Sequence, residues 1–520
     1  MLPENEHKSI FDLGEAEGVN DSERLLSKLC KKSFLSLWSH ANLFNDSDMH
    51  DGKGSSKELC DVLVVFGNDI IIFSDKHVTF QAHKPLDIAW KRWYKRAVVE
   101  SAAQLHGAMN WLKRHPNRVF LDERCTRPIP INIPSVEHAR YHLVAVTRGS
   151  FDACAMFFPG SLGSLAIKTD LEGNTHLDHP FTIGVVDRAK PFIHVLDEFS
   201  LEVVFREMDT IADLIEYLRK REAFLTNQNS SIISAGEEQL LAAYLFNMVD
   251  GEHEFLPKKH SKANADLVFF DESHYESMQE NEAYKRKKKA DEPSYIWDEL
   301  IERFVRIGSP TLVLPDAQQS NHETEQALRE MASESRFRRR ILVESLRGLL
   351  NASVATPNKW RARIVTSRQQ PERIYIFLVV PRSKEESDDE YRQHRAAVLH
   401  AYCRCGKLRF PKTTTFIGIG LDHPVRNYKM VSEDLMVYIC PELTEEARKE
   451  AESYREMLGI FKDDLPMHYE HDDEFPALEN SGSGNPVLQK VAKEIRCKVK
   501  ATKHKKKLAK ASRRRNRSQN

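Results

Sequence analysis

The chain has 520 residues, of which 41% are hydrophobic, and a formal net charge of −1 at pH 7. This length allows roughly two to four domains, and no apolar stretch is long enough to predict a membrane-spanning helix. The acidic N-terminus lacks the basic and then apolar order of a signal peptide, and the eight cysteines follow no repeating spacing. We therefore expect a cytoplasmic protein with reduced thiols.

The first predicted elements are a helix over 22–37, a turn-rich loop over 42–57 and two strands within 58–77. Residues 89–114 predict a long amphipathic helix. Its inner stripe consists of Tyr94, Val98, Ser101, Leu105, Ala108 and Leu112. Its start is kept basic by Lys91, Arg92, Lys95 and Arg96.

The next segment predicts strands at 118–121, 142–147, 181–187 and 191–196. A capped helix is expected over 209–225, and the polar stretch 226–231 is the best domain boundary in the first half. We expect a helix over 236–249, a charged loop over 279–292 and one or two helices over 323–350. Further strands are predicted at 362–366, 373–380 and 414–422.

Charged residues stand at both outer ends of the predicted hairpin 58–77. With a Gly67-Asn68 turn, Asp61 lies opposite Ser74 and diagonal to Lys76. With Asn68-Asp69 as the turn, Asp61 lies opposite Lys76 itself, and a three-residue turn places it opposite Asp75. Either two-residue turn gathers a carboxylate and an ammonium on one face at the open end of the hairpin.

This layout resembles the PD-(D/E)xK nuclease superfamily, in its restriction-endonuclease-like and nuclease-related branch. In that family an Asp opens one strand and a carboxylate-x-Lys motif closes the next. The resemblance covers roughly 20–120 and implies that Asp61 is a metal ligand and Lys76 the catalytic lysine. It also implies that Glu23 is an auxiliary ligand or base, and that Gln104 positions the lysine or the DNA backbone. The implied cofactor is Mg²⁺ or Mn²⁺, which activates the attacking water.

One position departs from the family pattern. The second carboxylate should stand two residues before the lysine, where this chain has Ser74. Asp75 is a catalytic and metal-binding candidate if a bulge re-aims it, and Glu58 is another candidate. If neither reaches the metal, the fold is a degenerate nuclease that binds without cutting. In the structural alternative, Asp61 only caps its strand, and Asp75 and Lys76 are solvated charges at the end of the next strand.

Other clusters have simpler explanations. Cys403 and Cys405, with His400 and Cys440 nearby, lack the paired spacing of a structural zinc site, so buried thiols are favoured. His468 and His471 are expected in a solvated acidic linker. The run 336–340, "RFRRR", is either a solvated helix face, which is favoured, or a DNA-facing patch.

The C-terminal end is strongly basic. Lys490–Asn520 has fourteen Lys and Arg against one acid, about +13, so the rest of the chain carries about −14. Such a segment buries almost nothing and is expected to be disordered. A flexible polycation binds nucleic acid non-specifically through counterion release. Steering toward another partner, folding back onto the acidic body, and a solubility role are the alternatives.

Together these patterns predict an α/β fold with an N-terminal restriction-endonuclease-like mixed sheet flanked by helices, a second α+β domain and a disordered basic tail. The expected domains are 1–128 (nuclease-like), 129–226 (its α/β extension), 235–470 (α+β, a possible protein-partner surface) and 471–520 (linker and tail). The predicted function is metal-dependent hydrolysis of DNA in a restriction or anti-phage setting. The alternatives are a non-catalytic nucleic-acid-binding protein and an interaction scaffold.

Overall fold

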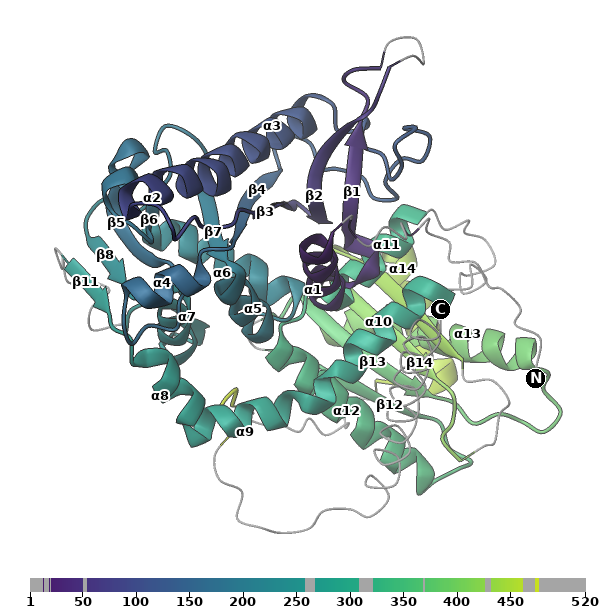
Figure 1. Cartoon of the computed structure of the whole chain (residues 1–520). Helices are drawn as coiled ribbons and strands as arrows, with labels where there is room; N and C mark the ends of the chain where they lie inside the picture. Colours follow the sequence, from purple (N-terminus) through teal and green to yellow (C-terminus); the bar gives the residue numbers. More distant parts are fainter. Residues whose placement is uncertain are drawn as a thin grey trace, which may run out of the picture. The chain divides into compact units, whose positions relative to one another are not determined.

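The structure is a computed structural model. It describes residues 13, 18, 20–49, 54–257, 267–307, 321–367, 370–425, 432–461 and 473–476. Its contacts form two compact units, Met1–Glu474 and Phe475–Asn520, and every helix and strand described below belongs to the first. The basic tail Lys490–Asn520 and the histidines His468 and His471 lie outside the described residues. The described fold is α/β, with helices flanking sheets, as predicted (Figure 1).

The first sheet is mixed, with the strand order β1-β2-β3-β4-β7. Its first three strands form an antiparallel meander, and the last two run parallel to β3. Their bounds are β1 Ser39–Asn45, β2 Lys57–Phe66, β3 Asp69–His77, β4 Arg140–Arg148 and β7 Ile193–Asp197. The strand expected over 118–121 is reduced to single bridges from Phe120 to Phe44 and Pro128.

The turn between β2 and β3 has two residues, Gly67 and Asn68. Phe66 pairs directly with Asp69, and Gly67 has a φ of 59°. A two-residue hairpin turn requires a positive φ at this position, which glycine adopts without a steric penalty. The first of the three predicted registers is therefore correct, and continuing the pairing of Val62 with Phe73 by one step places Asp61 opposite Ser74.

Helices cover both faces of this sheet. On one face, α1 (Asp21–Trp38) packs Phe34 against Phe73, with ring centroids 6.3 Å apart. On the other face lies a continuous helical segment that turns through one π-helical turn, and the Ser74 hydroxyl reaches Ser101 on it. Its parts are α2 Leu86–Tyr94, η1 Lys95–Val99 and α3 Glu100–Arg114.

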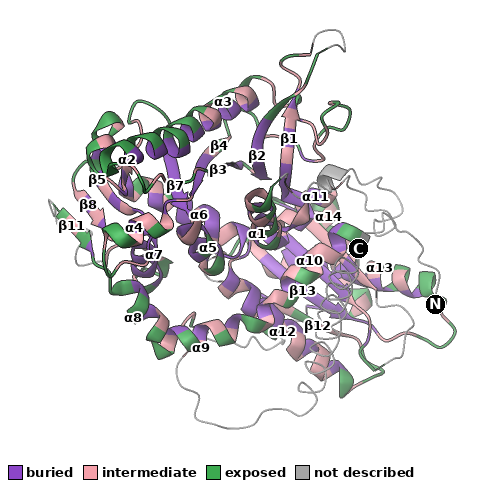
Figure 2. Ribbon diagram, in the orientation of Figure 1, coloured by how far each residue is buried: buried purple, intermediate pink, exposed green. Residues whose placement is uncertain are grey.

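The predicted pattern of this second helical segment is confirmed. All six residues of the expected inner stripe, from Tyr94 to Leu112, are buried. The four basic residues at its start, from Lys91 to Arg96, are exposed. The buried and exposed sides of α3 are visible as separate colours in Figure 2.

The second sheet has the order β11-β8-β5-β6. Its strands are β5 Ala166–Glu172, β6 Thr182–Val185, β8 Ser231–Ser234 and β11 Leu267–Phe270. The antiparallel pairing of β5 with β8 spans the stretch 226–231, so the chain on both sides of the expected boundary contributes to one sheet. The helices around it are α4 Phe151–Phe157, α5 Glu198–Glu207, α6 Ile211–Leu225 and α7 Glu237–Phe246; a 3-10 turn, η2 Gly173–Asp178, and the short pair β9 Met248–Val249 and β10 Glu252–His253 complete this part.

A helical segment leads from there to the third sheet. Residues 279–292, expected to be a loop, contain a helix because Asn281 caps it and Lys287 pairs with Asp291 one turn later at 2.8 Å. The segment 323–350 forms two helices separated near Ser335, which caps the second. The bounds are α8 His274–Glu280, α9 Glu282–Asp291, η3 Glu292–Ser294, α10 Tyr295–Ile307, α11 Asn321–Ala332 and α12 Arg336–Val354.

The third sheet, β12-β13-β14-β15, is buried on both faces at β13. Tyr375 and Phe377 join the large core shared with the first two sheets, and Trp297 stacks edge-on against Tyr375 at 5.4 Å. Ile374 and Ile376 face a second cluster under α13. The bounds are β12 Arg361–Val365, β13 Arg373–Val379, α13 Asp388–Arg409, β14 Thr415–Leu421, β15 Glu433–Ile439 and α14 Glu445–Leu458.

The run 336–340 is neither a solvated face nor a DNA-facing patch. Arg336, Arg339 and Arg340 are at most 6% exposed. Arg336 pairs with Asp209 and Asp298, both at 2.9 Å, and the guanidinium of Arg340 pairs with an aspartate of α9 at 3.0 Å. Asp209 is therefore a partner of α12 and does not cap α6, a role that Thr210 takes. No helix in the described part of the chain is long and apolar enough to cross a bilayer.

We expect Arg336→Ala to destabilise the protein by about 3–5 kcal/mol, because it leaves the buried carboxylate of Asp209 without its ion pair, while Asp298 keeps its pair with Arg339. Chemical unfolding followed by circular dichroism measures this loss. The matched control is Arg306→Ala, whose side chain is 63% exposed beside Glu302, and which we expect to cost at most about 1 kcal/mol. Equal losses for both variants would contradict a buried network.

Candidate functional site

Asp61 lies at the open end of the β2–β3 hairpin and is 7% exposed. Its Oδ2 accepts a hydrogen bond from the backbone N–H of Asp75 at 2.5 Å, which fixes the carboxylate on the neighbouring strand. The pKa of Asp61 is raised to about 7. Burial is the largest cause, and the charges of Glu58 and Glu23 also raise this pKa, while the hydrogen bond from the N–H of Asp75 lowers it. A carboxyl group with a pKa near 7 is partly protonated at neutral pH, and a bound cation would favour its ionised form.

Glu58 reaches the same region because β2 contains a β-bulge. The pairing of β1 with β2 steps from Leu43–Cys60 to Phe44–Glu58, so β2 has one extra residue there, Leu59. Leu59 and Cys60 are both buried while Glu58 is exposed, so the alternation of faces is reset by one position. Burial and the Glu23 charge raise the pKa of Glu58, and Lys76 lowers it.

Glu23 approaches this hairpin from the first turn of α1. Its backbone N–H donates to the side chain of Asn20 at 2.9 Å, and its carboxylate accepts a hydrogen bond from the Asn20 amide. The negative charge of Glu23 acts on both hairpin carboxylates, since it raises the pKa of Asp61 and of Glu58. Helix α1 therefore brings a third acid to the hairpin end, and the role of Glu23 as an auxiliary ligand or base stays a prediction.

Lys76 supplies the positive charge of the group. It is half-buried, and its ammonium makes no hydrogen bond or ion pair with any side chain in the described ranges. Its charge lowers the pKa of both Asp61 and Glu58, so it lies within electrostatic range of both. An ammonium near acids but without a fixed partner is available to a bound anion.

Ser74 and Gln104 form the floor of the site. Ser74 is fully buried, and its Oγ lies 3.2 Å from Oε1 of Gln104 and 3.4 Å from Oγ of Ser101 on α3. The family's second carboxylate position therefore holds a hydroxyl that is bonded to the covering helix. Gln104 joins α3 to β3 through this contact with Ser74, and its predicted role toward the lysine or the DNA backbone stays a prediction.

Asp75 points to the opposite face and has a dedicated partner. Both of its oxygens accept hydrogen bonds from Arg148, at 2.9 to 3.1 Å, and its side chain has no exposed surface. The pairing of β3 with β4 continues unbroken from Asp69 to His77, so the re-aiming bulge considered for Asp75 does not occur. The charges of Asp61, Glu58, Glu23 and Lys76 therefore act on one another, while Asp75 is within range of the Glu23 charge but is bonded to Arg148.

The carboxylates of this group are spread around the hairpin end. Among the described residues, the only set of three His, Cys, Asp or Glu ligand atoms within 4.8 Å of one another is that of His142, His194 and Glu222. The oxygens of Asp61, Glu58 and Glu23 thus stand farther apart as a set.

Sequence reasoning missed the Arg148 partner and the His142–His194 pair. A signal for the pair was present, because the two predicted strands 142–147 and 191–196 each carry one histidine among apolar residues.

Cys403 and Cys405 are buried free thiols of α13. Comparison of the chain with protein-family models, with curated proteins and with solved structures gave no match.

We expect Arg148→Ala to destabilise the protein by about 3–5 kcal/mol at pH 7, because it leaves the Asp75 carboxylate buried and unpaired. Burial already raises the pKa of Asp75, although Arg148 opposes this shift. A carboxyl group whose folded-state pKa is raised stabilises the fold more as the pH falls. The deficit relative to the native protein should therefore shrink between pH 7 and pH 4, measured by urea unfolding at each pH.

The control for this measurement is Arg118→Ala, because Arg118 is 44% exposed beside Asp46. Its deficit should be at most about 1 kcal/mol and should change little over the same pH range. A deficit of Arg148→Ala that stays constant with pH would show that packing, and not the Asp75 charge, accounts for the loss.

Proposed function

We propose that this chain is a metal-dependent nuclease of the PD-(D/E)xK type whose active site lies at the open end of the β2–β3 hairpin. The observation that carries the proposal is the placement of Asp61 and Lys76 on adjacent strands and on one face at the open end of a hairpin with a two-residue turn. The element order α1-β1-β2-β3-α3-β4, with an antiparallel meander followed by a parallel strand, supports the same assignment.

Glu58 takes the role of the carboxylate that is missing at Ser74. The bulge at Leu59 puts Glu58 on the side of Asp61, and the charges of Glu58, Asp61 and Lys76 act on one another. Asp75 then has a structural role, because its ion pair with Arg148 fixes the end of β3 from which Lys76 projects.

The residues divide the chemistry among them. Asp61 and Glu58 would hold Mg²⁺ or Mn²⁺, which lowers the pKa of a bound water and neutralises phosphate charge. Lys76 orients the attacking water and offsets the negative charge that develops on the phosphate. Glu23 accepts the proton of that water or completes the ligand set. Gln104 keeps β3 and α3 in register beneath them.

The proposed substrate is DNA, in a restriction or anti-phage setting within the cytoplasm. The exposed Lys91, Arg92, Lys95 and Arg96 offer positive charge on the helical segment that covers the Ser74 face. The tail Lys490–Asn520 adds about +13. Both act on phosphates and carry no sequence information.

A second candidate is a non-catalytic nucleic-acid-binding protein on the same fold. It is favoured by the hydroxyl of Ser74 at the second carboxylate position and by the commitment of Asp75 to Arg148. In that case the surface between 235 and 470 would bind a protein partner. An interaction scaffold without nucleic-acid affinity is the third alternative.

Incubation of plasmid DNA with the protein and Mg²⁺ or Mn²⁺ tests the nuclease. We expect cleavage that Asp61→Asn, Glu58→Gln and Lys76→Ala each reduce by about 100-fold or more, because each removes transition-state or metal stabilisation. Asp61→Asn is nearly isosteric and keeps an oxygen for the Asp75 N–H. The control Glu137→Gln changes an exposed acid before β4 and should leave the rate unchanged.

The outcomes separate the candidates. Binding of DNA without cleavage by the native protein would favour the non-catalytic function. Cleavage that survives all three substitutions would contradict the assigned site. Full activity of Glu58→Gln alone would contradict the role given to Glu58.

Deletion of 485–520 tests the tail. We expect DNA binding to weaken alike for unrelated sequences, and the dependence of log K on log salt concentration to become less steep, since fewer counterions are released. Titrations of two unrelated duplexes at several salt concentrations measure both effects. A loss confined to one sequence, or an unchanged salt slope, would argue against a polycationic tether.

A further inference from the structure

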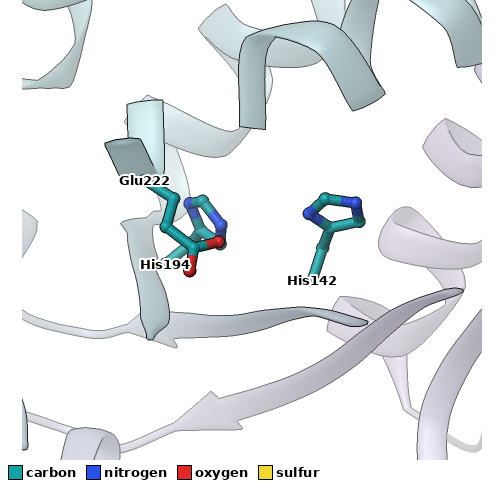
Figure 3. A group of neighbouring side chains, drawn as sticks. All are labelled: His142, His194 and Glu222. Carbon is teal, nitrogen blue, oxygen red and sulfur yellow. The ribbon is translucent and has the colours of Figure 1, made fainter. Parts of the chain in front are cut away.

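A second group of titratable side chains lies on the other face of the first sheet. His142 on β4, His194 on β7 and Glu222 on α6 each place one ligand atom within 4.8 Å of the others. Figure 3 shows the side chains of these three residues directed toward one common point. The parallel pairing of Val144 with His194 places the two histidines on one face, two positions apart. His142 pairs with Ile71 of β3, and the β4 residue that pairs with Lys76 lies five positions after His142.

Each histidine has one anchored and one unpartnered ring nitrogen. Nε2 of His142 lies 3.0 Å from a carboxylate oxygen of Asp69, and Nδ1 of His194 lies 3.2 Å from Nη1 of Arg221. Within the described residues, Nδ1 of His142 and Nε2 of His194 have no hydrogen-bond partner, although the two residues are 3% and 0% exposed. Buried polar atoms without partners are rare and mark places where a water or an ion binds.

The bond from His142 to Asp69 prepares His142 for coordination. A carboxylate accepts only from an N–H, so the proton of His142 lies on Nε2 and a lone pair remains on Nδ1. The carboxylate–histidine–metal arrangement is the usual outer shell of a histidine ligand. Burial also lowers the pKa of His194 well below its usual value, which keeps that imidazole neutral.

Glu222 completes the donor set from α6. Its side chain is half-buried, and burial raises the pKa of its carboxyl group. Two imidazoles and one carboxylate are a donor set typical of Zn²⁺ with one open position, and they suit Mg²⁺ poorly. The half-exposed Glu222 gives an ion access from the solvent side.

We propose that His142, His194 and Glu222 form a binding site for a transition-metal ion of the zinc class, separate from the hairpin site. The ion would join α6 to β4 and β7, and solvent would fill its fourth position. This inference does not depend on the proposed nuclease activity. The ion would be coordinated by both unpartnered nitrogens, Nδ1 of His142 and Nε2 of His194.

Arg221 sets a condition on this site. A guanidinium only donates, so its contact with Nδ1 of His194 holds the proton of that ring on Nε2. Coordination through Nε2 requires the other tautomer, so metal binding must displace this single contact. Arg221 keeps its two bonds to Glu237, through Nε and Nη2, both at 2.7 Å. The alternative occupant is a water that accepts from His194 and donates to His142 and Glu222.

Zinc binding by the full-length protein distinguishes the two occupants. After removal of metals with a chelator, Zn²⁺ is titrated by calorimetry, and Co²⁺ is added as a spectroscopic probe. We expect one tight equivalent, with Co²⁺ bands free of thiolate charge transfer, because the donors are nitrogen and oxygen. The thermal midpoint should also rise with Zn²⁺ concentration.

Variants assign the site. Glu222→Gln is nearly isosteric and His142→Ala removes a ligand, and each should weaken this equivalent by at least about tenfold. His83→Ala, which removes an exposed histidine, and Asp61→Asn, at the hairpin, should leave it unchanged. If His142→Ala does not fold, Glu222→Gln decides. Absence of a tight equivalent in the native protein, or equal affinity in Glu222→Gln, would overturn the proposal.

Discussion

The two-residue turn at Gly67 and Asn68 is the constraint on which the candidate site depends. Because side chains alternate along a strand, a turn one residue longer would exchange the faces of β3 relative to β2. The positive φ of Gly67 makes the short turn favourable, and the register that follows places Asp61 opposite the buried Ser74. The same alternation sends Asp75 to the face where Arg148 receives it. One backbone conformation thus determines the surroundings of three polar residues: Ser74 faces α3, Asp61 lies at the candidate site, and Asp75 forms a structural ion pair.

Electrostatics separates the functional charges from the structural ones. The buried carboxylates of Asp75 and Asp209 each have a fixed opposite partner, Arg148 and Arg336 respectively. At the hairpin end, burial is the main cause that raises the pKa of Asp61 to about 7, and the charges of Glu58 and Glu23 act in the same direction. Repulsion of this kind costs stability and persists where a bound cation relieves it. This contrast is the physical reason for assigning function to the hairpin and stability to the arginine network.

The sequence predicted features that local patterns determine. The turn, the buried stripe from Tyr94 to Leu112 and the continuously buried hairpin strands follow from glycine placement, helical periodicity and aliphatic runs. Local sequence patterns did not predict the features that depend on tertiary contacts. Nothing local distinguishes Arg336 on a solvated helix from Arg336 beside Asp209, 127 residues earlier in the chain. The bulge at Leu59 depends equally on the pairing with β1, so Glu58 was only one of two candidates. The division into domains stays a prediction.

The extra residue in β2 has a consequence for how related sites are recognised. The bulge brings Glu58 to the face of Asp61 from a position that a linear motif does not contain, since Glu58 lies on the other strand from Lys76. A search that requires an acid two residues before the lysine passes over such a chain. A search that asks which oxygens and nitrogens converge in space does not. At this hairpin the position of a carboxylate in space therefore depends on strand pairing as well as on its place in the sequence.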